Sequence, residues 1–220
     1  MQLLGTCFFE EKKVIRSTIL AALLCMSFFA GCGTQPPARD ARQQPATKVE
    51  LEGFSKWQSV CSSERVNPTF AGREADISDS RIAADWANLY GRLRTVSDLE
   101  KLRGVNLFFN RWPYKEDRDV WNKEDHWSTP REFMEFGGDC EDFAIAKYYA
   151  LKELGMGVDR LRIAGVWNKK LRTGHAVLVV RVDGREWALD NLSDAPVLLS
   201  ELPHYAVQYY TNENSIWKRE

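Results

Sequence analysis

Three residues of this chain have side chains suited to nucleophilic catalysis: Cys140, His175 and Asp190. Cys140 follows Gly-Gly-Asp and precedes a mainly apolar segment, so Asp139 is a candidate N-cap for a buried helix that begins at Cys140. At the first position of a helix, unpaired backbone N–H groups and the helix dipole favour the thiolate, which is the nucleophilic form of cysteine. The sequence therefore predicts a thiol nucleophile at a helix tip; a small core cysteine is the alternative.

Short sequence signals define the elements around Cys140. Thr129-Pro-Arg-Glu has the form of a capping box with proline at the first helical position, and it predicts a short helix that ends at Gly137. The helix that carries Cys140 is expected to continue to a glycine stop at Gly155.

Two longer helices are predicted upstream, at residues 78–93 and 96–109, from apolar side chains at helical spacing. The expected caps are Ser78 or Ser80 for the first helix and Ser97 for the second. The polar and aromatic residues 110–127 predict an ordered loop that forms one wall of a cleft, and His126 within it is expected to be a surface or packing histidine.

Segments rich in Val, Leu and Ile predict three strands, at residues 161–167, 174–182 and 185–190. Between the last two, Asp183-Gly184 is typical of a two-residue hairpin turn. In that register, His175 and Asp190 lie on the same face of the sheet as diagonal neighbours. Their backbones are then about 7–8 Å apart, which is within reach of a hydrogen bond between the side chains. A His–Asp pair that only stabilises the hairpin is the alternative.

In a triad of these residues, Cys140 attacks a carbonyl, and His175 takes the thiol proton and returns it to the leaving amine. Asp190 orients the imidazole and stabilises its cation. The backbone N–H of Cys140 is the expected oxyanion donor. The competing structural interpretation is a disulfide between Cys61 and Cys140 in an oxidising compartment.

The N-terminal part of the chain predicts export. Residues 1–32 have a basic region followed by an apolar run that is too short to span a bilayer comfortably. The run ends in Phe-Ala-Gly-Cys, which resembles a bacterial lipobox, so Cys32 is a candidate lipidation site; ordinary signal cleavage is the alternative. Residues 33–48 are rich in proline and glutamine and predict a flexible linker, which leaves one folded domain at residues 49–220. The net charge of −1 gives no electrostatic reason to expect binding to nucleic acid.

Four segments are similar to those of the bacterial transglutaminase-like cysteine proteases of the LapG type. They are Trp127-Ser-Thr-Pro-Arg-Glu-Phe, Gly137-Gly-Asp-Cys-Glu-Asp-Phe-Ala-Ile-Ala-Lys-Tyr, His175-Ala-Val-Leu and Leu189-Asp-Asn-Leu. The similarity spans residues 54–217. The glycine pair before Asp-Cys-Glu-Asp-Phe-Ala, combined with the later His and Asp-Asn, makes the signal specific.

The resemblance implies an α+β, papain-like fold of the transglutaminase-like type, with N-terminal helices and a central cysteine-bearing helix packed on an antiparallel sheet. It implies a periplasmic endopeptidase that cleaves a large repeat adhesin near the adhesin's N-terminus and thereby disperses a biofilm. It also implies an inner-membrane cyclic-diguanylate receptor that captures and inhibits the protease. The lipobox departs from the family pattern, because a lipid anchor would hold the enzyme on a membrane. Gly33 after the cysteine favours the outer membrane.

The resemblance further implies a calcium ion beside the nucleophile, with Asp139, Glu141 and Asp142 as the matching ligands. Several carboxylates with hard oxygen atoms suit calcium. Acidic residues in the first turn of a helix are also favoured by the dipole without a metal, which is the alternative. Two other functions stay open: a transglutaminase or amidase on the same fold, and a non-catalytic envelope lipoprotein.

Overall fold

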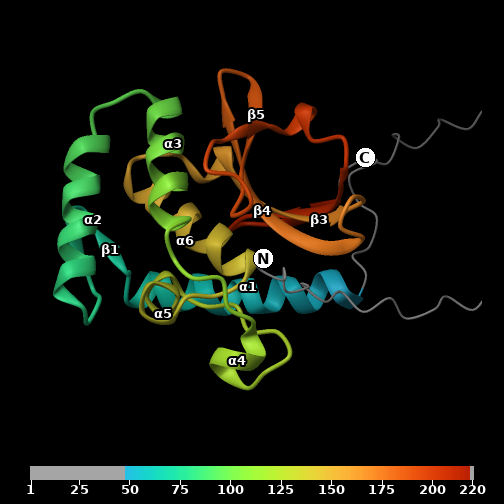
Figure 1. Ribbon diagram of the computed structural model, residues 1–220, viewed down its shortest axis with the longest axis horizontal. Coiled ribbons are helices and arrows are strands. Elements are labelled where there is room, and N and C mark those ends of the chain that lie inside the picture. The colour runs from blue at the N-terminus through green and yellow to red at the C-terminus, as the bar shows by residue number, and fades with distance from the viewer. Residues whose placement is uncertain (1–47, 219–220) are drawn as a thin grey trace, which may run out of the picture.

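The computed structural model describes residues 48–218, in which helices come first and strands follow (Figure 1). The helices are α1 (Lys48–Val66), α2 (Ser80–Leu93), α3 (Asp98–Phe109), α4 (Asp117–Trp121), α5 (Pro130–Phe136), α6 (Cys140–Glu153) and the 3-10 helices η1 (Val158–Arg160) and η2 (Leu199–Glu201). The strands are β1 (Phe70–Ala71), β2 (Glu74–Ala75), β3 (Leu161–Asn168), β4 (Thr173–Val182), β5 (Arg185–Leu189), β6 (Val197–Leu198), β7 (Tyr205–Thr211) and β8 (Ile216–Lys218).

The predicted export signal, with Cys32, and the linker up to residue 47 lie outside the described residues. Among the helices that the structure does describe, none combines the length and the apolar character needed to cross a membrane.

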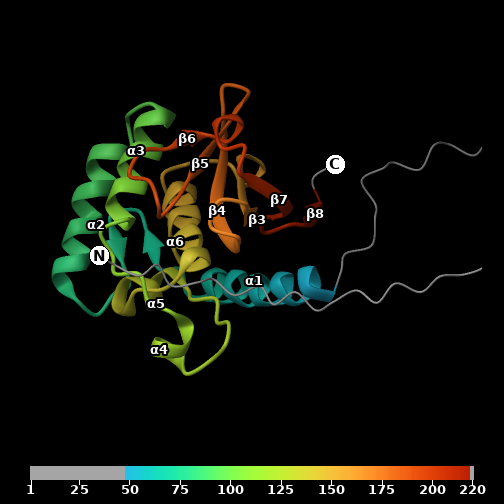
Figure 2. The same cartoon turned by 45° about the vertical axis from the view of Figure 1, so that its right-hand side comes forward.

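Helix α6 lies between α3 and the main sheet (Figures 1 and 2). It packs against β3 and β4 on one side and against α3 and α5 on the other. Ile145 and Leu151 of α6 are completely buried, and burial of each such side chain stabilises the fold by about 1.5–3 kcal/mol. This arrangement confirms the predicted α+β fold with a central cysteine-bearing helix.

The main sheet has the strand order β6-β5-β4-β3-β7-β8, and all its neighbouring strands are antiparallel. One face of the sheet packs on α6 through side chains that include Ile163 and Val180. The opposite face has a second, smaller apolar cluster around Val177, Val179 and Tyr210. Both faces are therefore apolar in the middle of the sheet, so the hairpin turn, and not an alternation of apolar and polar residues, fixes the register of β4 against β5.

The predicted helices are present with one corrected cap. Helix α3 begins after Ser97, which forms a capping box with Glu100 as the sequence predicts. Helix α2 is capped by Asp79, whose carboxylate accepts a hydrogen bond from the backbone N–H of Arg81. The prediction of Ser78 or Ser80 as this cap is wrong, because Ser80 already lies in the first helical turn and Asp79 holds the extended backbone that an N-cap requires.

Candidate active site

The turn between α5 and α6 places Cys140. Thr129 and Glu132 exchange hydrogen bonds in the predicted capping box, and Gly137 ends α5 with a φ of 79°. A Cβ atom at the following residue, Gly138, would overlap the side chain of Asp142. Glycine is therefore required at this position for the two segments to approach so closely. Helix α6 then begins at Cys140, as predicted.

Asp139 holds the N-cap position of α6, but its side chain makes no capping hydrogen bond. The prediction of Asp139 as the N-cap residue is correct, but the hydrogen bond that usually accompanies this position is absent. The carboxylate instead lies with that of Glu141 in a group of acidic side chains. The first N–H groups of α6 are thus not taken by a capping side chain from Asp139, which leaves the helix tip suited to an incoming oxyanion.

Cys140 is buried, with 2% of its surface exposed, and its Sγ lies 3.2 Å from Oε2 of Glu141. Cys61 is a free, buried cysteine, so it forms no disulfide with Cys140. The predicted alternative, a Cys61–Cys140 disulfide, is wrong. Nucleophilic chemistry at Cys140 requires the reduced thiol.

The hairpin of β4 and β5 brings His175 and Asp190 together. Asp183 and Gly184 form its two-residue loop, both with positive φ (49° and 73°), as in a type I′ turn. The strands pair in the register expected from this turn, with Leu178 opposite Leu189. Nε2 of His175 lies 2.9 Å from Oδ1 of Asp190, so the contact expected from the sequence is present.

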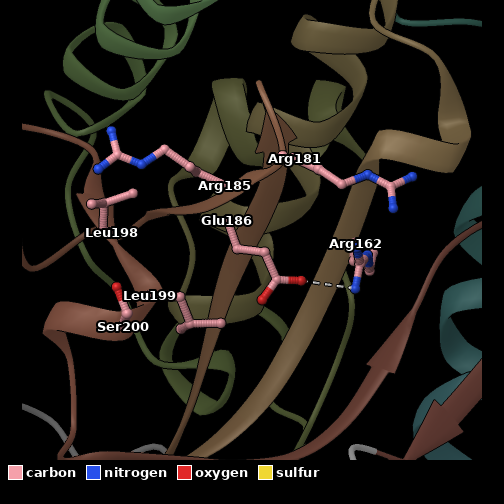
Figure 3. Close-up of a pocket in the computed structure, with 8 residues that line it drawn as sticks. Arg162, Arg181, Arg185, Glu186, Leu198, Leu199 and Ser200 are labelled. Carbon is pink, nitrogen blue, oxygen red and sulfur yellow. Dashed lines mark ion pairs between the residues drawn. The ribbon is translucent and has the colours of Figure 1, made fainter.

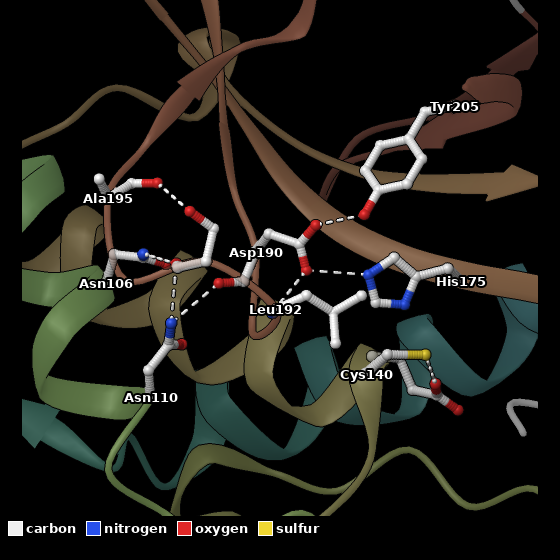
Figure 4. A network of polar contacts seen from close by, with 10 residues as sticks. Asn106, Asn110, Cys140, His175, Asp190, Leu192, Ala195 and Tyr205 are labelled. Carbon is white, nitrogen blue, oxygen red and sulfur yellow. Dashed lines mark hydrogen bonds and ion pairs between the residues drawn. The ribbon is translucent and has the colours of Figure 1, made fainter. Parts of the chain in front are cut away.

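Figure 4 shows the imidazole of His175 between Asp190 and Cys140. Helix α6, which carries Cys140, packs directly against β4, which carries His175. A carboxylate can only accept a hydrogen bond, so Nε2 of His175 carries the hydrogen in this contact. The lone pair of the neutral ring is then on Nδ1, on the edge of the ring that faces away from Asp190.

Asp190 is held by more groups than the sequence indicated. The hydroxyl of Tyr205 donates to its Oδ2 at 2.5 Å, and the backbone N–H of Leu192 donates to its Oδ1 at 2.9 Å. Burial raises the pKa of Asp190, but the hydrogen bond and charge of His175 and the hydroxyl of Tyr205 outweigh burial and hold this pKa below its usual value. The carboxylate therefore stays ionised at neutral pH.

Asn106 of α3 and Asn110, the residue at the C-cap of α3, anchor the loop that follows Asp190. The side-chain amide of Asn110 donates to the backbone oxygens of Asp190 (2.9 Å) and Ser193 (3.0 Å). The amide of Asn106 donates to the backbone oxygens of Ser193 (2.7 Å) and Asp194 (3.0 Å). The loop that carries the catalytic candidate is thus fixed to a helix far away in the sequence (Figure 4).

An acidic cluster lies beside Cys140. The predicted residues Asp139, Glu141 and Asp142 are joined there by Asp117 and Asp125, and subsets of three bring oxygen atoms within 4.8 Å of one another. Sequence reasoning missed the last two, because residues 110–127 were predicted only as a loop. Burial and the neighbouring negative charges raise the pKa of Asp139, and burial raises that of Asp117 to about 6.

The cluster has the properties of a cation site. Oδ1 of Asp139 and Oδ1 of Asp117 are buried and have no hydrogen-bond partner among the described residues. Asp142 is different, because both its oxygens accept hydrogen bonds from Ser128. Buried carboxylates without partners are unfavourable unless a cation or a proton compensates them, and oxygen ligands of this kind suit calcium.

A cavity of about 510 Å³ lies elsewhere, on β3, β4 and β5 (Figure 3). Its lining includes Arg162, Arg181 and Arg185, together with Glu186, which pairs with Arg162 at 3.1 Å. Arg181 is six residues along β4 from His175, or roughly 20 Å at the rise of a strand. This cavity is therefore not part of the site around Cys140.

A cysteine at the start of a helix that packs on an antiparallel sheet, with a histidine on one strand and an aspartate directly after the neighbouring strand, defines the transglutaminase-like class of cysteine proteases. The chain belongs to the bacterial transglutaminase-like cysteine proteinase family, whose model matches residues 86–219. It is therefore a cysteine protease with a protein substrate.

Solved structures of Legionella pneumophila LapG are similar to this chain. The calcium-bound form is 30% identical, with a TM-score of 0.58 over 72% of this chain and 87% of LapG. The EGTA-treated form is 29% identical, with a TM-score of 0.59 over 73% of this chain and 86% of LapG. No curated protein matches the chain.

Proposed function

We propose that this protease is a calcium-dependent periplasmic endopeptidase that cleaves a large repeat adhesin near the adhesin's N-terminus, with Cys140, His175 and Asp190 as its triad. Release of the adhesin would disperse a biofilm. The observation that carries the proposal is the imidazole of His175, which is bonded to Asp190 through Nε2 and has its other edge toward Cys140.

The geometry supports a defined path for protons. Nδ1 of His175 accepts the proton of the Cys140 thiol as Sγ attacks the scissile carbonyl carbon, and the backbone N–H of Cys140 donates to the oxyanion. When the C–N bond breaks, the imidazolium gives this proton to the leaving amine. Water then attacks the thioester, His175 takes the proton of this water, and the C–S bond breaks to restore the thiolate. Asp190 stabilises the imidazolium throughout.

Calcium is proposed to bind the acidic cluster, with Asp139, Glu141 and Asp142 as ligands and Asp117 and Asp125 as further candidates. When bound, it would offset the negative charge of Glu141, which lies 3.2 Å from the sulfur and would otherwise disfavour the thiolate. A calcium-bound form and an EGTA-treated form of LapG support this assignment.

The proposed setting follows the family resemblance. We propose that the protease acts in the periplasm, that Cys32 anchors it by lipidation to the outer membrane, and that an inner-membrane cyclic-diguanylate receptor captures and inhibits it. Fractionation of cells that express the full chain tests the location: wild type in the membrane fraction and Cys32→Ala in the soluble periplasm is the expected pair of results.

Cleavage of the N-terminal region of an adhesin encoded beside this protein tests the activity. The purified, reduced domain should cut it, Cys140→Ala should not, and the control Cys61→Ala should cut like wild type. Cleavage by Cys140→Ala would exclude the proposed nucleophile. Incorporation of an added primary amine instead of hydrolysis would indicate a transglutaminase, and cleavage that continues in EGTA would remove calcium from the proposal.

A further inference from the structure

Lys147 is a buried lysine for which the proposed triad has no role. It lies on α6, seven residues after Cys140, and is completely buried. Its Nζ has no hydrogen-bond partner among the described residues and lies 5.6 Å from the centre of the Phe143 ring. A buried ammonium without a hydrogen-bonded partner destabilises a fold, so an apolar residue at this position would be more stable.

The charges that act on Lys147 come from the loop after β5. Burial lowers the pKa of Lys147 to about 7, and the carboxylates of Asp190 and Asp194 act in the opposite direction. The charge of Lys147 therefore interacts with two carboxylates of this loop, one of them the catalytic candidate Asp190. On the other side of Asp190, His175 and Tyr205 are its hydrogen-bond partners.

The same loop is held by α3, which packs on α6. The amides of Asn106 and Asn110 donate to the backbone of residues 190–194, while the Oδ1 atom of each asparagine is buried without a partner among the described residues. The loop of residues 190–194 thus interacts with one buried cation and two side-chain amides. Such a concentration of polar groups in a core is expected at functional sites and is otherwise avoided.

We propose that Lys147 is a positioning residue for the protease reaction: its ammonium, together with Asn106 and Asn110, holds the loop that carries Asp190 and so keeps Asp190 correctly placed against His175. This inference rests on the proposed triad. Lys147 touches neither the substrate nor the reacting atoms, and acts through Asp190 alone. In this proposal Lys147 supports catalysis and lowers the stability of the fold relative to an apolar residue at the same position.

The rate of alkylation of Cys140 by iodoacetamide tests this without a substrate. In reduced protein, the rate between about pH 5 and 9 reports the thiolate that His175 and Asp190 stabilise. Lys147→Met should lower this rate at about pH 6 by roughly tenfold or more, because small misplacements of catalytic groups have effects up to about a hundredfold. Lys152→Met, which removes a half-exposed lysine of the same helix, is the matched control and should react like wild type.

Thermal unfolding separates positioning from support of the fold. The pKa of Lys147 is lowered in the folded protein, so its charge destabilises the fold below the folded pKa, and this effect disappears as the pH rises past the usual pKa of lysine. Lys147→Met should therefore raise the melting temperature at about pH 6, by an amount that shrinks toward about pH 10. The expected combination is slower alkylation in a more stable protein.

Three results would overturn the inference. They are alkylation of Lys147→Met at the wild-type rate, a parallel loss of stability and rate, and failure of both Lys147→Met and Lys147→Leu to fold, which would make the lysine a support of the fold. Failure of the triad gives a different result: wild-type Cys140 would then react no faster than an ordinary exposed thiol.

Discussion

Cys61 and Cys140 are both buried helical cysteines, with 7% and 2% of their surface exposed, but their surroundings are opposite. Cys61 lies inside α1, where burial raises the pKa of its thiol to about 11 despite a hydrogen bond with Tyr149. Cys140 lies at the first position of α6, next to the His175–Asp190 pair. Low exposure therefore does not distinguish Cys61 from Cys140, the proposed nucleophile. The groups around each thiol do distinguish them.

The largest expected effect tests this contrast directly. Cys140→Ala should lower kcat by roughly a millionfold, to background, because loss of a nucleophile removes the covalent route. Cys61→Ala should leave kcat within about twofold and lower the melting temperature, since it opens a small gap in the core. Cleavage assays and thermal unfolding of both variants check this, and equal losses of kcat would end the contrast.

The second effect concerns Asp190, whose carboxylate is part of the surroundings of Cys140 and not of those of Cys61. Asp190→Asn should lower kcat by roughly a hundredfold to ten-thousandfold, because the imidazole loses both its orientation and its partner charge. The pKa of Asp190 is lowered in the folded protein, so its stabilising contribution is present above its unfolded pKa and is lost as the pH falls through the folded pKa. Between about pH 5 and 3, wild type should therefore lose more stability than Asp190→Asn.

The third effect concerns the acidic cluster, which Cys61 lacks. Calcium at roughly a hundred times its Kd should stabilise the wild type by about 2.7 kcal/mol. Asp117→Asn should weaken calcium binding by roughly tenfold to a hundredfold. Glu124→Gln, an exposed acid of the same loop that pairs with Arg118, is the control. The measurement is the melting temperature of the wild type, Asp117→Asn and Glu124→Gln as calcium is added. Identical curves for the wild type and Asp117→Asn would exclude Asp117 as a ligand.

The smallest effect comes from the tyrosine that completes the environment of Asp190. Tyr205→Phe removes one hydrogen bond to a carboxylate, which is worth about 1.5–3 kcal/mol, and should lower kcat by roughly tenfold with little change in KM. A change in KM alone would indicate that Tyr205 contacts the substrate instead.

The sequence alone predicts the structure correctly where the signal lies in a few neighbouring residues. The capping box at Thr129, the glycine stop at Gly155 and the two-residue turn at Asp183 each depend on a few adjacent residues, and all three are present. The turn predicted the contact between His175 and Asp190, because strand register follows from the length of the loop. Local rules therefore predicted the fold class and the geometry of the hairpin.

The sequence alone does not predict contacts between residues that are far apart in the chain and lie in segments without a periodic pattern or a turn signal. Tyr205 lies on β7, which pairs with β3 through an irregular register and has no turn signal of its own, so its bond to Asp190 could not be inferred. Asp117 joins Glu141 from a segment without apolar periodicity. Lys147 is completely buried, although lysine is a residue type that is rarely found in a core. The carboxylates that act on its charge, Asp190 and Asp194, are far from it in the sequence and are identified only from the structure.

The two-residue turn at Asp183 and Gly184 has a consequence for how this enzyme can vary. One residue inserted there would shift every later residue of β5 to the other side of the sheet, and Asp190 would leave His175 although neither had been replaced. The turn is roughly 25 Å from the histidine along the strand. Relatives of this protease can exchange these exposed turn residues for others that accept a positive φ, such as asparagine or glycine, but an odd change in their number would separate the members of the proposed triad.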